Sequence, residues 1–143
     1  MGFLTGKTAI ITGAGRAILK DGSCGSIGYG IATAYAKEGA NLVITGRNVK
    51  KLEAAKQELD SLYGIKVLTV QADVCAGGDN EATVANVVKQ AVDTFGGIQV
   101  LINTAQASAS GVPLAEHTTE QFDLAIYSGL YAAFYYMKAC YPY

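Results

Sequence analysis

Residues 8–12 read TAIIT, residues 13–16 read GAGR and residues 25–30 read GSIGYG, and this stretch decides the fold. The first run is compact, apolar and rich in β-branched residues, as in a buried strand of a parallel sheet. After the glycines, the residues from Gly30 to Glu38 predict a helix that ends at Gly39, a residue suited to a left-handed cap. A buried strand, a glycine-rich loop and a helix in this order indicate the first unit of a nucleotide-binding α/β fold.

Short apolar runs and amphipathic segments alternate along the rest of the chain. Further strands are expected at residues 41–45, 66–70 and 100–103, and further helices from Asn48 to about Tyr63, from Asp79 to Phe95, and from about Thr119 to the C-terminus. Strands that alternate with helices predict βαβ units with right-handed crossovers. Residues 1–143 are therefore expected to form one α/β domain, the N-terminal half of a Rossmann-type doubly wound parallel sheet in strand order 3-2-1-4.

The composition argues against several classes of protein. Half of the residues are apolar, 16% are charged and the net charge is -1, so neither disorder nor a surface for nucleic acid or anionic membranes is expected. No run approaches the roughly 18 apolar residues of a membrane span, and the N-terminus has no targeting leader. The single histidine, His117, and the distant cysteines Cys24, Cys75 and Cys140 predict no metal site and no disulfide framework. We expect a soluble, cytoplasmic protein with reduced thiols.

The glycine-rich loop is the candidate phosphate site. In a βαβ unit, the turn after the first strand brings backbone N–H groups to a pyrophosphate at the positive end of a helix, and glycine permits that close approach. Gly13, Ser26, Ile27 and Gly28 are therefore candidate cofactor-binding residues. A purely structural turn is the alternative for a glycine cluster, but its place between a buried strand and a helix favours the phosphate site.

A basic residue follows the second expected strand, where the ribose of an adenosine would lie. An acidic residue there would accept hydrogen bonds from the ribose hydroxyl, whereas the fork of donors in Arg47 matches a 2′-phosphate. Arg47, with Asn48 beside it, therefore favours NADP(H) as the cofactor, and Arg16 in the long loop is a second candidate. An ordinary solvated side chain is the alternative for Arg47.

The pair Thr12–Gly13 together with Gly28 resembles the TGxxxGxG fingerprint of the short-chain dehydrogenase/reductase family. The outer glycines lie 15 positions apart here, so the loop has nine extra residues, and Ser26 replaces the middle glycine. The resemblance implies further cofactor contacts after the third and fourth strands, with substrate contacts just beyond them. The residues at these positions are Asp73 and Val74 toward adenine, Asn103 and Ala105 in the place of the family's Asn-Asn-Ala-Gly segment, and Gln106 and Ser108 toward nicotinamide and substrate.

From Ser26 to Tyr143 the chain is similar to the branch of this family that acts on the 12α-hydroxyl of bile acids, most distinctively at residues 105–111, AQASASG. The resemblance implies hydride transfer between NADP(H) and a secondary alcohol or ketone of a steroid. Six of the nine tyrosines fall in the last 17 residues, on a helix that is apolar nearly all round and so is expected to be buried. In this family the corresponding helix packs against a partner subunit, which implies a homodimer or homotetramer. Packing in the core of one chain is the alternative.

The family's catalytic tyrosine and lysine, four positions apart, have no counterpart in this chain. We therefore expect a chain that ends before the catalytic segment, with no catalytic residue and no activity of its own. Tyr131 and Lys138 match a Tyr-x6-Lys spacing but lie one βα unit too early, and Gly129 stands where many members have a helper asparagine. Two alternatives remain open: a reductase of another carbonyl or enoyl substrate, and a noncatalytic dinucleotide-binding module.

Overall fold

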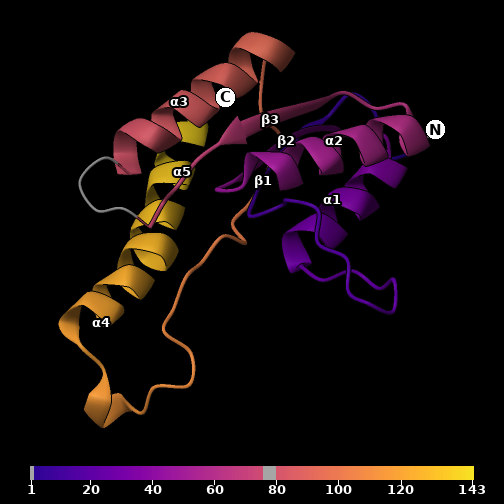
Figure 1. Cartoon of the computed structure of the whole chain (residues 1–143). Coiled ribbons are helices and arrows are strands. Elements are labelled where there is room, and N and C mark those ends of the chain that lie inside the picture. The colour runs from indigo at the N-terminus through magenta and orange to yellow at the C-terminus, as the bar shows by residue number, and fades with distance from the viewer. Residues whose placement is uncertain (1, 76–79) are drawn as a thin grey trace.

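The computed structural model describes residues 2–75 and 80–143, and strands and helices alternate along it (Figure 1). The strands are β1 (Thr8–Thr12), β2 (Asn41–Gly46), β3 (Val67–Gln71) and β4 (Val100–Ile102). The helices between them are α1 (Ile27–Lys37), α2 (Val49–Tyr63) and α3 (Asn80–Phe95). After β4 come a 3-10 turn (Leu114–Glu116), α4 (Thr119–Ala125), a π-helical segment (Ile126–Tyr131) and α5 (Ala132–Cys140).

The four strands form one parallel sheet in the order β3-β2-β1-β4, so the predicted fold class is confirmed. In the central strand β1, Thr12 lies opposite Thr45 of β2, and Ile11 lies opposite Ile102 of β4. Helices α1 and α2 cover one face of the sheet, and α3 and α5 cover the other (Figure 1). Because all four strands run in the same direction, their carboxyl ends meet at one edge, where α/β proteins of this class bind ligands.

Alternate residues of the central strands fill two cores. Ile11 and Ile44 are fully buried on the side of α1 and α2, whereas Ile10 and Val43 are fully buried on the side of α3 and α5. A strand that is covered on both faces needs apolar residues at successive positions, which explains the continuous run in β1. Each buried side chain of this size contributes roughly 1.5–3 kcal/mol. The central strands therefore hold the loops at their carboxyl ends on a rigid base.

Helix α1 starts earlier than its sequence predicts. Helix α1 begins at Ile27, so the expected start at Gly30 was wrong by one turn. The Ser26 hydroxyl accepts a hydrogen bond from Tyr29 N at 3.3 Å and caps this earlier turn. Glycine has a low helix propensity, so the GSIGYG pattern concealed the turn that the cap stabilises. The predicted cap of α3, Asp79, lies outside the described residues.

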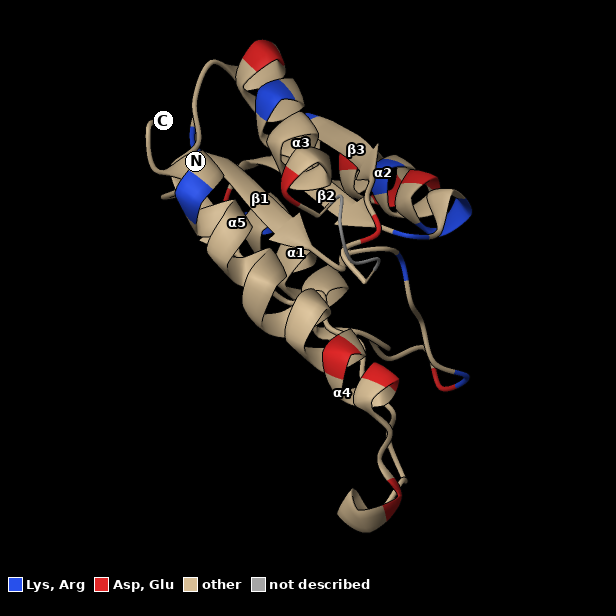
Figure 2. Ribbon diagram, turned by 90° about the vertical axis from the view of Figure 1, so that its left-hand side faces the viewer, with Lys and Arg blue, Asp and Glu red and all other residues tan. Residues whose placement is uncertain are grey.

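The C-terminal helix is less buried than its apolar sequence predicts. Between residues 126 and 140, Ser128, Ala132 and Tyr136 are the buried residues, whereas Leu130 is 66% exposed. Packing within one chain therefore covers only one side of this helix, and the expectation that a partner subunit covers the other side stays a prediction. Helix α5 packs one side against α3 and the sheet, and it presents its other side to solvent. Figure 2 shows few charged residues along this helix between its two ends.

Within residues 2–75 and 80–143, no helix is long and apolar enough to cross a membrane, and no group of three or more His, Cys, Asp or Glu side chains is placed to hold a metal ion. Cys24, Cys75 and Cys140 are free thiols. His117 is half-buried, and its Nδ1 is shielded from solvent without a hydrogen-bond partner among the described residues.

Candidate dinucleotide-binding site

Three adjoining hollows lie at the carboxyl edge of the sheet. The loop hollow, of about 240 Å³, lies between the glycine-rich loop and the start of α2. The strand-end hollow, of about 190 Å³, follows the ends of β2, β3 and β4, and the deep hollow, of about 210 Å³, lies between β4 and the C-terminal helix. The predicted site residues that line one or more of them are Gly13, Ser26, Arg47, Asn48, Val74, Asn103, Ala105 and Gln106. The predicted residues that do not line these three hollows are Arg16, Ile27, Gly28, Asp73 and Ser108.

The close contact between the turn after β1 and the start of α1 requires glycine at two positions. Gly13 has a left-handed backbone with φ +66°, and a β-carbon there would lie 3.1 Å from Ala105 Cα. Gly28 is buried, and a β-carbon there would stand 2.3 Å from Gly13 O and 2.8 Å from Thr104 Oγ1. The start of α1 therefore abuts the turn directly. Its first N–H groups, at Ile27 and Gly28, have no intrahelical partner and provide donors for an anion.

The extra residues of the loop fold outward as a small hairpin. Ile18 pairs with Cys24 in an antiparallel bridge, and Gly25 N donates a hydrogen bond to Ala17 O at 2.7 Å. The two ends of the insertion thus lie side by side. This closure explains how the two glycines of the turn meet although 15 positions separate them in the sequence.

Two basic side chains line the loop hollow. Arg47 is exposed just after β2, and Lys51 comes from the first turn of α2. The Asn48 side chain caps that helix by accepting a hydrogen bond from Lys51 N at 3.0 Å. The first turn of α2 contains no acidic residue, and within residues 2–75 and 80–143 neither cation forms a salt bridge. The hollow is therefore electropositive, because the N-terminus of a helix adds to the two cations.

Lys51 is a site residue that the sequence interpretation missed. The signal was present, because Asn48 was expected to cap the helix and Lys51 is three positions further on. Residues at this position lie close to the cap, since side chains of a helix lean toward its N-terminus. Lys51 therefore accompanies Arg47 as a candidate partner for an anionic group.

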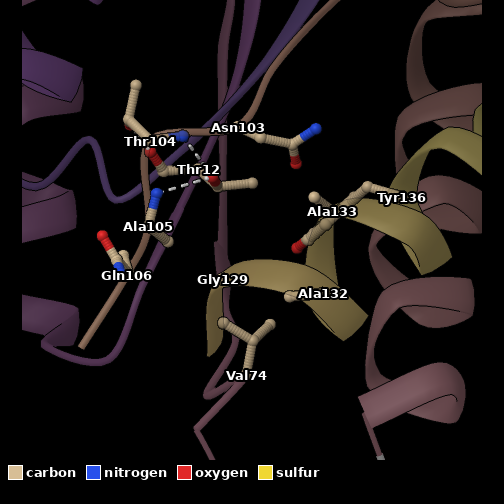
Figure 3. Close-up of a pocket in the computed structure, with 10 residues that line it drawn as sticks. All are labelled: Thr12, Val74, Asn103, Thr104, Ala105, Gln106, Gly129, Ala132, Ala133 and Tyr136. Carbon is tan, nitrogen blue, oxygen red and sulfur yellow. Dashed lines mark hydrogen bonds between the residues drawn. The ribbon is translucent and has the colours of Figure 1, made fainter. Parts of the chain in front are cut away.

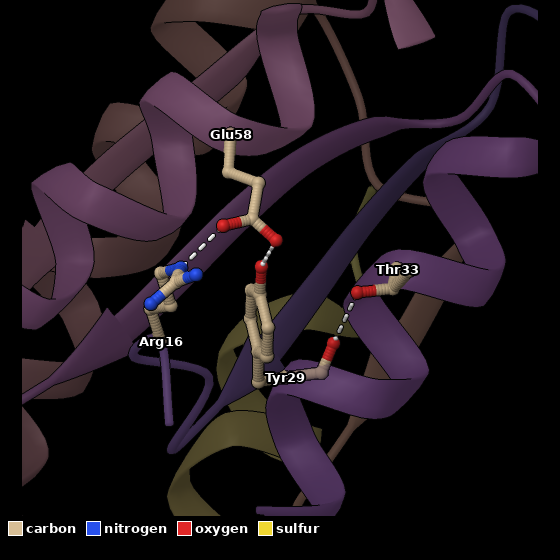
Figure 4. Close-up of polar contacts among 4 residues, drawn as sticks. All are labelled: Arg16, Tyr29, Thr33 and Glu58. Atoms are coloured by element: carbon tan, nitrogen blue, oxygen red, sulfur yellow. Dashed lines mark hydrogen bonds and ion pairs between the residues drawn. The ribbon is translucent and has the colours of Figure 1, made fainter. Parts of the chain in front are cut away.

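The Arg16 side chain lies along α2 instead of in the loop hollow. Its Nε forms an ion pair with the Glu58 carboxylate, and the Tyr29 hydroxyl donates to the other carboxylate oxygen at 2.5 Å (Figure 4). Arg16 N also donates to Lys51 O at 2.9 Å. These contacts anchor the long loop to α2 and α1. The predicted contact of Arg16 with a phosphate is not tested by this arrangement and stays a prediction.

The Glu58 contacts also shift two pKa values. Hydrogen bonds from Tyr29 and then from Arg16 lower the pKa of the Glu58 carboxyl. Burial, followed by the hydrogen bond to Glu58, raises the pKa of Tyr29 to about 12. The carboxylate is therefore ionised and the phenol neutral at physiological pH, which keeps the three groups attractive to one another.

The residues after β3 form a short turn. Asp73 is exposed, and its Oδ1 accepts a hydrogen bond from Cys75 N at 2.9 Å. Such a bond is typical of an aspartate that stabilises its own turn. Val74 is buried and lines both the strand-end and the deep hollow. The contact of these two residues with adenine, which the family resemblance implies, stays a prediction.

The loop after β4 is tied to the end of β1 by one threonine. Thr12 Oγ1 accepts hydrogen bonds from Thr104 N and Ala105 N, both at 3.0 Å (Figure 3). The Thr104 hydroxyl donates in turn to Thr12 O. Asn103 faces the deep hollow and Gln106 lies in the strand-end and deep hollows, so the loop contributes to both. Ser108 is exposed further along the same loop.

Tyr136 of α5 also lines the deep hollow, and the sequence interpretation did not include it. The residue is 1% exposed, and its hydroxyl has no hydrogen-bond partner among the described residues. Burial raises the pKa of Tyr136 to about 12. Figure 3 shows the hydroxyl directed toward the centre of the hollow. No sequence pattern marks such a residue, because helix packing alone decides which of the six C-terminal tyrosines is buried beside the hollow.

A parallel sheet in the order β3-β2-β1-β4, with a glycine turn against the start of α1, defines a Rossmann-type α/β fold. A family model described as enoyl-(acyl carrier protein) reductase matches residues 22–143. The chain belongs to the short-chain dehydrogenase/reductase family, so the resemblance read from the sequence is confirmed.

Several known proteins are similar to most or all of the chain. A 12alpha-hydroxysteroid dehydrogenase of a Clostridium sp. is 59% identical over 143 residues, which are 100% of this chain and 52% of that protein. Hydroxysteroid dehydrogenase-like protein 2 of Bos taurus is 33% identical over 149 residues, covering 99% of this chain and 32% of that protein. The crystal structure of L-sorbose reductase from Gluconobacter frateurii, complexed with NADPH and L-sorbose, has a TM-score of 0.84 and 30% identity, covering 99% of this chain and 48% of that one. The chain thus spans about half the length of the first of these relatives and of the sorbose reductase.

Proposed function

We propose that the protein containing this chain is an NADP(H)-dependent oxidoreductase that acts on a hydroxysteroid, at the 12α-hydroxyl of bile acids. The observation that carries the proposal is the 59% identity to a 12alpha-hydroxysteroid dehydrogenase over the whole chain. The phrase AQASASG at residues 105–111, of which Ala105 and Gln106 line the deep hollow, supports the same branch of the family. Solved structures of similar proteins with NADPH or NADP support the cofactor.

This chain would supply the binding site of the cofactor. Backbone N–H groups at Gly13, Ile27 and Gly28 would face the pyrophosphate, and Arg47 with Lys51 would hold the 2′-phosphate. Asp73 and Val74 would border the adenine, and Asn103 and Ala105 would border the nicotinamide ribose. When bound, the cofactor supplies or accepts the hydride. Gln106 and Ser108 would contact the substrate on the same side.

None of the acid–base chemistry is assigned to the described residues. Tyr131 is partly exposed and stacks on Tyr127 with ring centroids 5.2 Å apart, while Lys138 forms an ion pair with Glu81 at 2.6 Å. These contacts give Tyr131 and Lys138 no shared site, which supports the view that their Tyr-x6-Lys spacing is accidental. In this proposal the chain is the half of the enzyme that binds the cofactor, and it has no catalytic activity of its own.

The exposed side of the C-terminal helix supports a homo-oligomer. Leu130, Phe134 and Met137 are each more than half exposed, and they lie at helical spacing along one side. Contiguous apolar surface of this kind marks an interface. We therefore propose a homodimer or homotetramer. We further propose that the protein is located in the cytoplasm, acts on a small-molecule substrate and has no nucleic acid or membrane partner.

A second candidate is a reductase of another carbonyl or of an enoyl substrate. The observation that favours it is the family model that matches residues 22–143, whose description is an enoyl-(acyl carrier protein) reductase. A noncatalytic dinucleotide-binding module is the third reading, and it shares the cofactor site. Substrate turnover separates the three.

The test uses the protein expressed from its complete gene. We expect it to reduce a 12-oxo bile acid with NADPH in preference to NADH. Replacing Arg47 by Ala should raise the Kd of NADPH about 10- to 100-fold, since a charge-assisted hydrogen bond contributes about 1.5–3 kcal/mol. The Kd of NADH should change less than about twofold, because NADH has no 2′-phosphate.

Lys51→Ala should act in the same direction, and Lys50→Ala is the matched control because Lys50 is an exposed lysine that does not line the loop hollow. Preference for NADH, or an equal loss for both cofactors in Arg47→Ala, would overturn the cofactor assignment. Reduction of an enoyl thioester but not of the 12-oxo bile acid would favour the second candidate, and NADPH binding without turnover would favour the module.

A further inference from the structure

The π-helical segment Ile126–Tyr131 lies between the loop after β4 and the segment after β3. That loop and that segment both line the deep hollow. A π-helical turn adds a residue to the helix, loosens its regular hydrogen bonding and occurs frequently at functional sites. Ser128 is the buried residue of this segment, with 1% of its surface exposed. A buried hydroxyl at this position requires partners, because an unpaired one is costly.

The Ser128 hydroxyl contacts both polar groups of one residue in the loop after β4. It accepts a hydrogen bond from Ala107 N at 2.9 Å and lies 3.1 Å from Ala107 O. It also lies 2.7 Å from Leu124 O, one turn earlier in its own helix. A hydroxyl has one proton and two lone pairs, so it donates to one of the two carbonyls while it accepts from Ala107 N. Among the described residues, no other hydrogen bond joins residues 103–111 of the loop to residues 126–140 of the C-terminal helix.

The residue before Ala107 is Gln106, whose side chain lies over the same segment. A β-carbon at Gly129 would meet Gln106 Cγ at 3.5 Å and Nε2 at 3.7 Å, so the two residues are in close packing. On the opposite side, Asn80 Nδ2 donates to Val74 O at 2.8 Å and approaches Tyr127 O at 3.4 Å. The π-helical segment is therefore held from both sides, and the position of Gln106 follows from it.

We propose that Ser128 is a positioning residue that fixes the loop after β4, so that Gln106 faces the substrate side of the site. The substrate side is that of the proposed function, on which this part of the inference rests. Ser128 does not line any of the three hollows, so it acts through Ala107 and Gln106 and not by touching substrate. Removing its hydroxyl frees the Ala107 amide and lets Gln106 move, while the cofactor contacts near Gly13 and Arg47 stay in place.

The test compares Ser128→Ala and Ser128→Cys with the wild type, again in the protein from the complete gene. Cysteine fills the same space with a much weaker hydrogen-bonding group, so it separates packing from hydrogen bonding. Ser61→Ala is the matched control, because Ser61 is exposed on α2 and remote from the loop. Three quantities are measured: amide exchange at Ala107, the Kd of NADPH, and kcat and KM for a 12-oxo bile acid.

We expect both Ser128 variants to increase amide exchange at Ala107 and to raise KM about tenfold, which corresponds to about 1.4 kcal/mol. The Kd of NADPH and kcat should each change less than twofold, and Ser61→Ala should match the wild type. Unchanged exchange at Ala107 would overturn the proposal, as would faster exchange with unchanged KM. A parallel rise of KM and the Kd of NADPH would also overturn it, because that result indicates general loosening.

Failure of the proposed function gives a different result. In that case the wild type shows no NADPH binding or no turnover of the bile acid, and exchange at Ala107 decides alone whether Ser128 fixes the loop.

Discussion

Two glycines in helix α1, only two positions apart, should respond in opposite ways to alanine. At Gly28 the new methyl group would stand 2.3 Å from Gly13 O and 2.8 Å from Gly13 C. A methyl carbon and a carbonyl oxygen ordinarily approach no closer than about 3.3 Å. The neighbour that must yield is backbone in a turn with φ +66°, and it cannot move as a flexible side chain does.

The magnitudes follow from these contacts. Forcing a methyl group into a packed site costs about 1–3 kcal/mol, and the contact with rigid backbone puts Gly28→Ala in the upper part of that range, at about 2–3 kcal/mol. The higher helix propensity of alanine offsets about 1 kcal/mol of this cost. Gly28→Ala should therefore lower the free energy of unfolding by about 1–2 kcal/mol, and it should weaken NADPH binding because it opens the turn to which the proposed function assigns the pyrophosphate. At Gly30 a β-carbon would meet Cys24 Sγ at 3.4 Å, an ordinary contact. Gly30→Ala should therefore raise the free energy of unfolding by up to about 1 kcal/mol.

Urea unfolding and NADPH titration of both variants check this pair. The reasoning is refuted if Gly28→Ala retains the stability and NADPH affinity of the wild type, since the close approach to Gly13 would then be absent. Equal destabilisation by Gly30→Ala would show that α1 tolerates no added methyl group, so that contact distances do not decide the effect of alanine in this helix.

Two further predictions concern buried or paired polar groups. Tyr136→Phe should raise the free energy of unfolding by about 1 kcal/mol, because it removes a buried hydroxyl without a partner among the described residues; a clear loss of stability in urea would show that the hydroxyl is paired. Glu58 has a lowered pKa in the folded state, so its stabilising contribution is present above the unfolded pKa of about 4.3 and is lost as pH falls through the folded value. The wild type should accordingly exceed Glu58→Gln in stability at pH 7 and lose that advantage progressively as the pH falls below about 4.3, whereas a difference that does not change with pH would contradict the assignment.

Part of the site could be read from the sequence, and part could not. Gly13 and Gly28 were predictable because a tight approach of two backbone segments leaves room only for glycine. Arg47 was predictable because the strand before it ends at a known edge of the sheet. Ser128 and Tyr136 were not, because Tyr136 is one of six tyrosines in the last 17 residues and no pattern marks the single serine there, Ser128, as buried. Which of them turns inward depends on how that helix packs.

The sequence by itself determined that short apolar runs alternate with amphipathic segments, and these patterns specify a parallel α/β fold through local periodicity and handed crossovers. The tertiary structure decided which groups meet across long stretches of chain. It pairs Arg16 with Glu58 beside Tyr29, and it leaves one side of the C-terminal helix exposed. The physical reason is that periodicity assigns a residue to a face of its own element, whereas its partner depends on which other element covers that face.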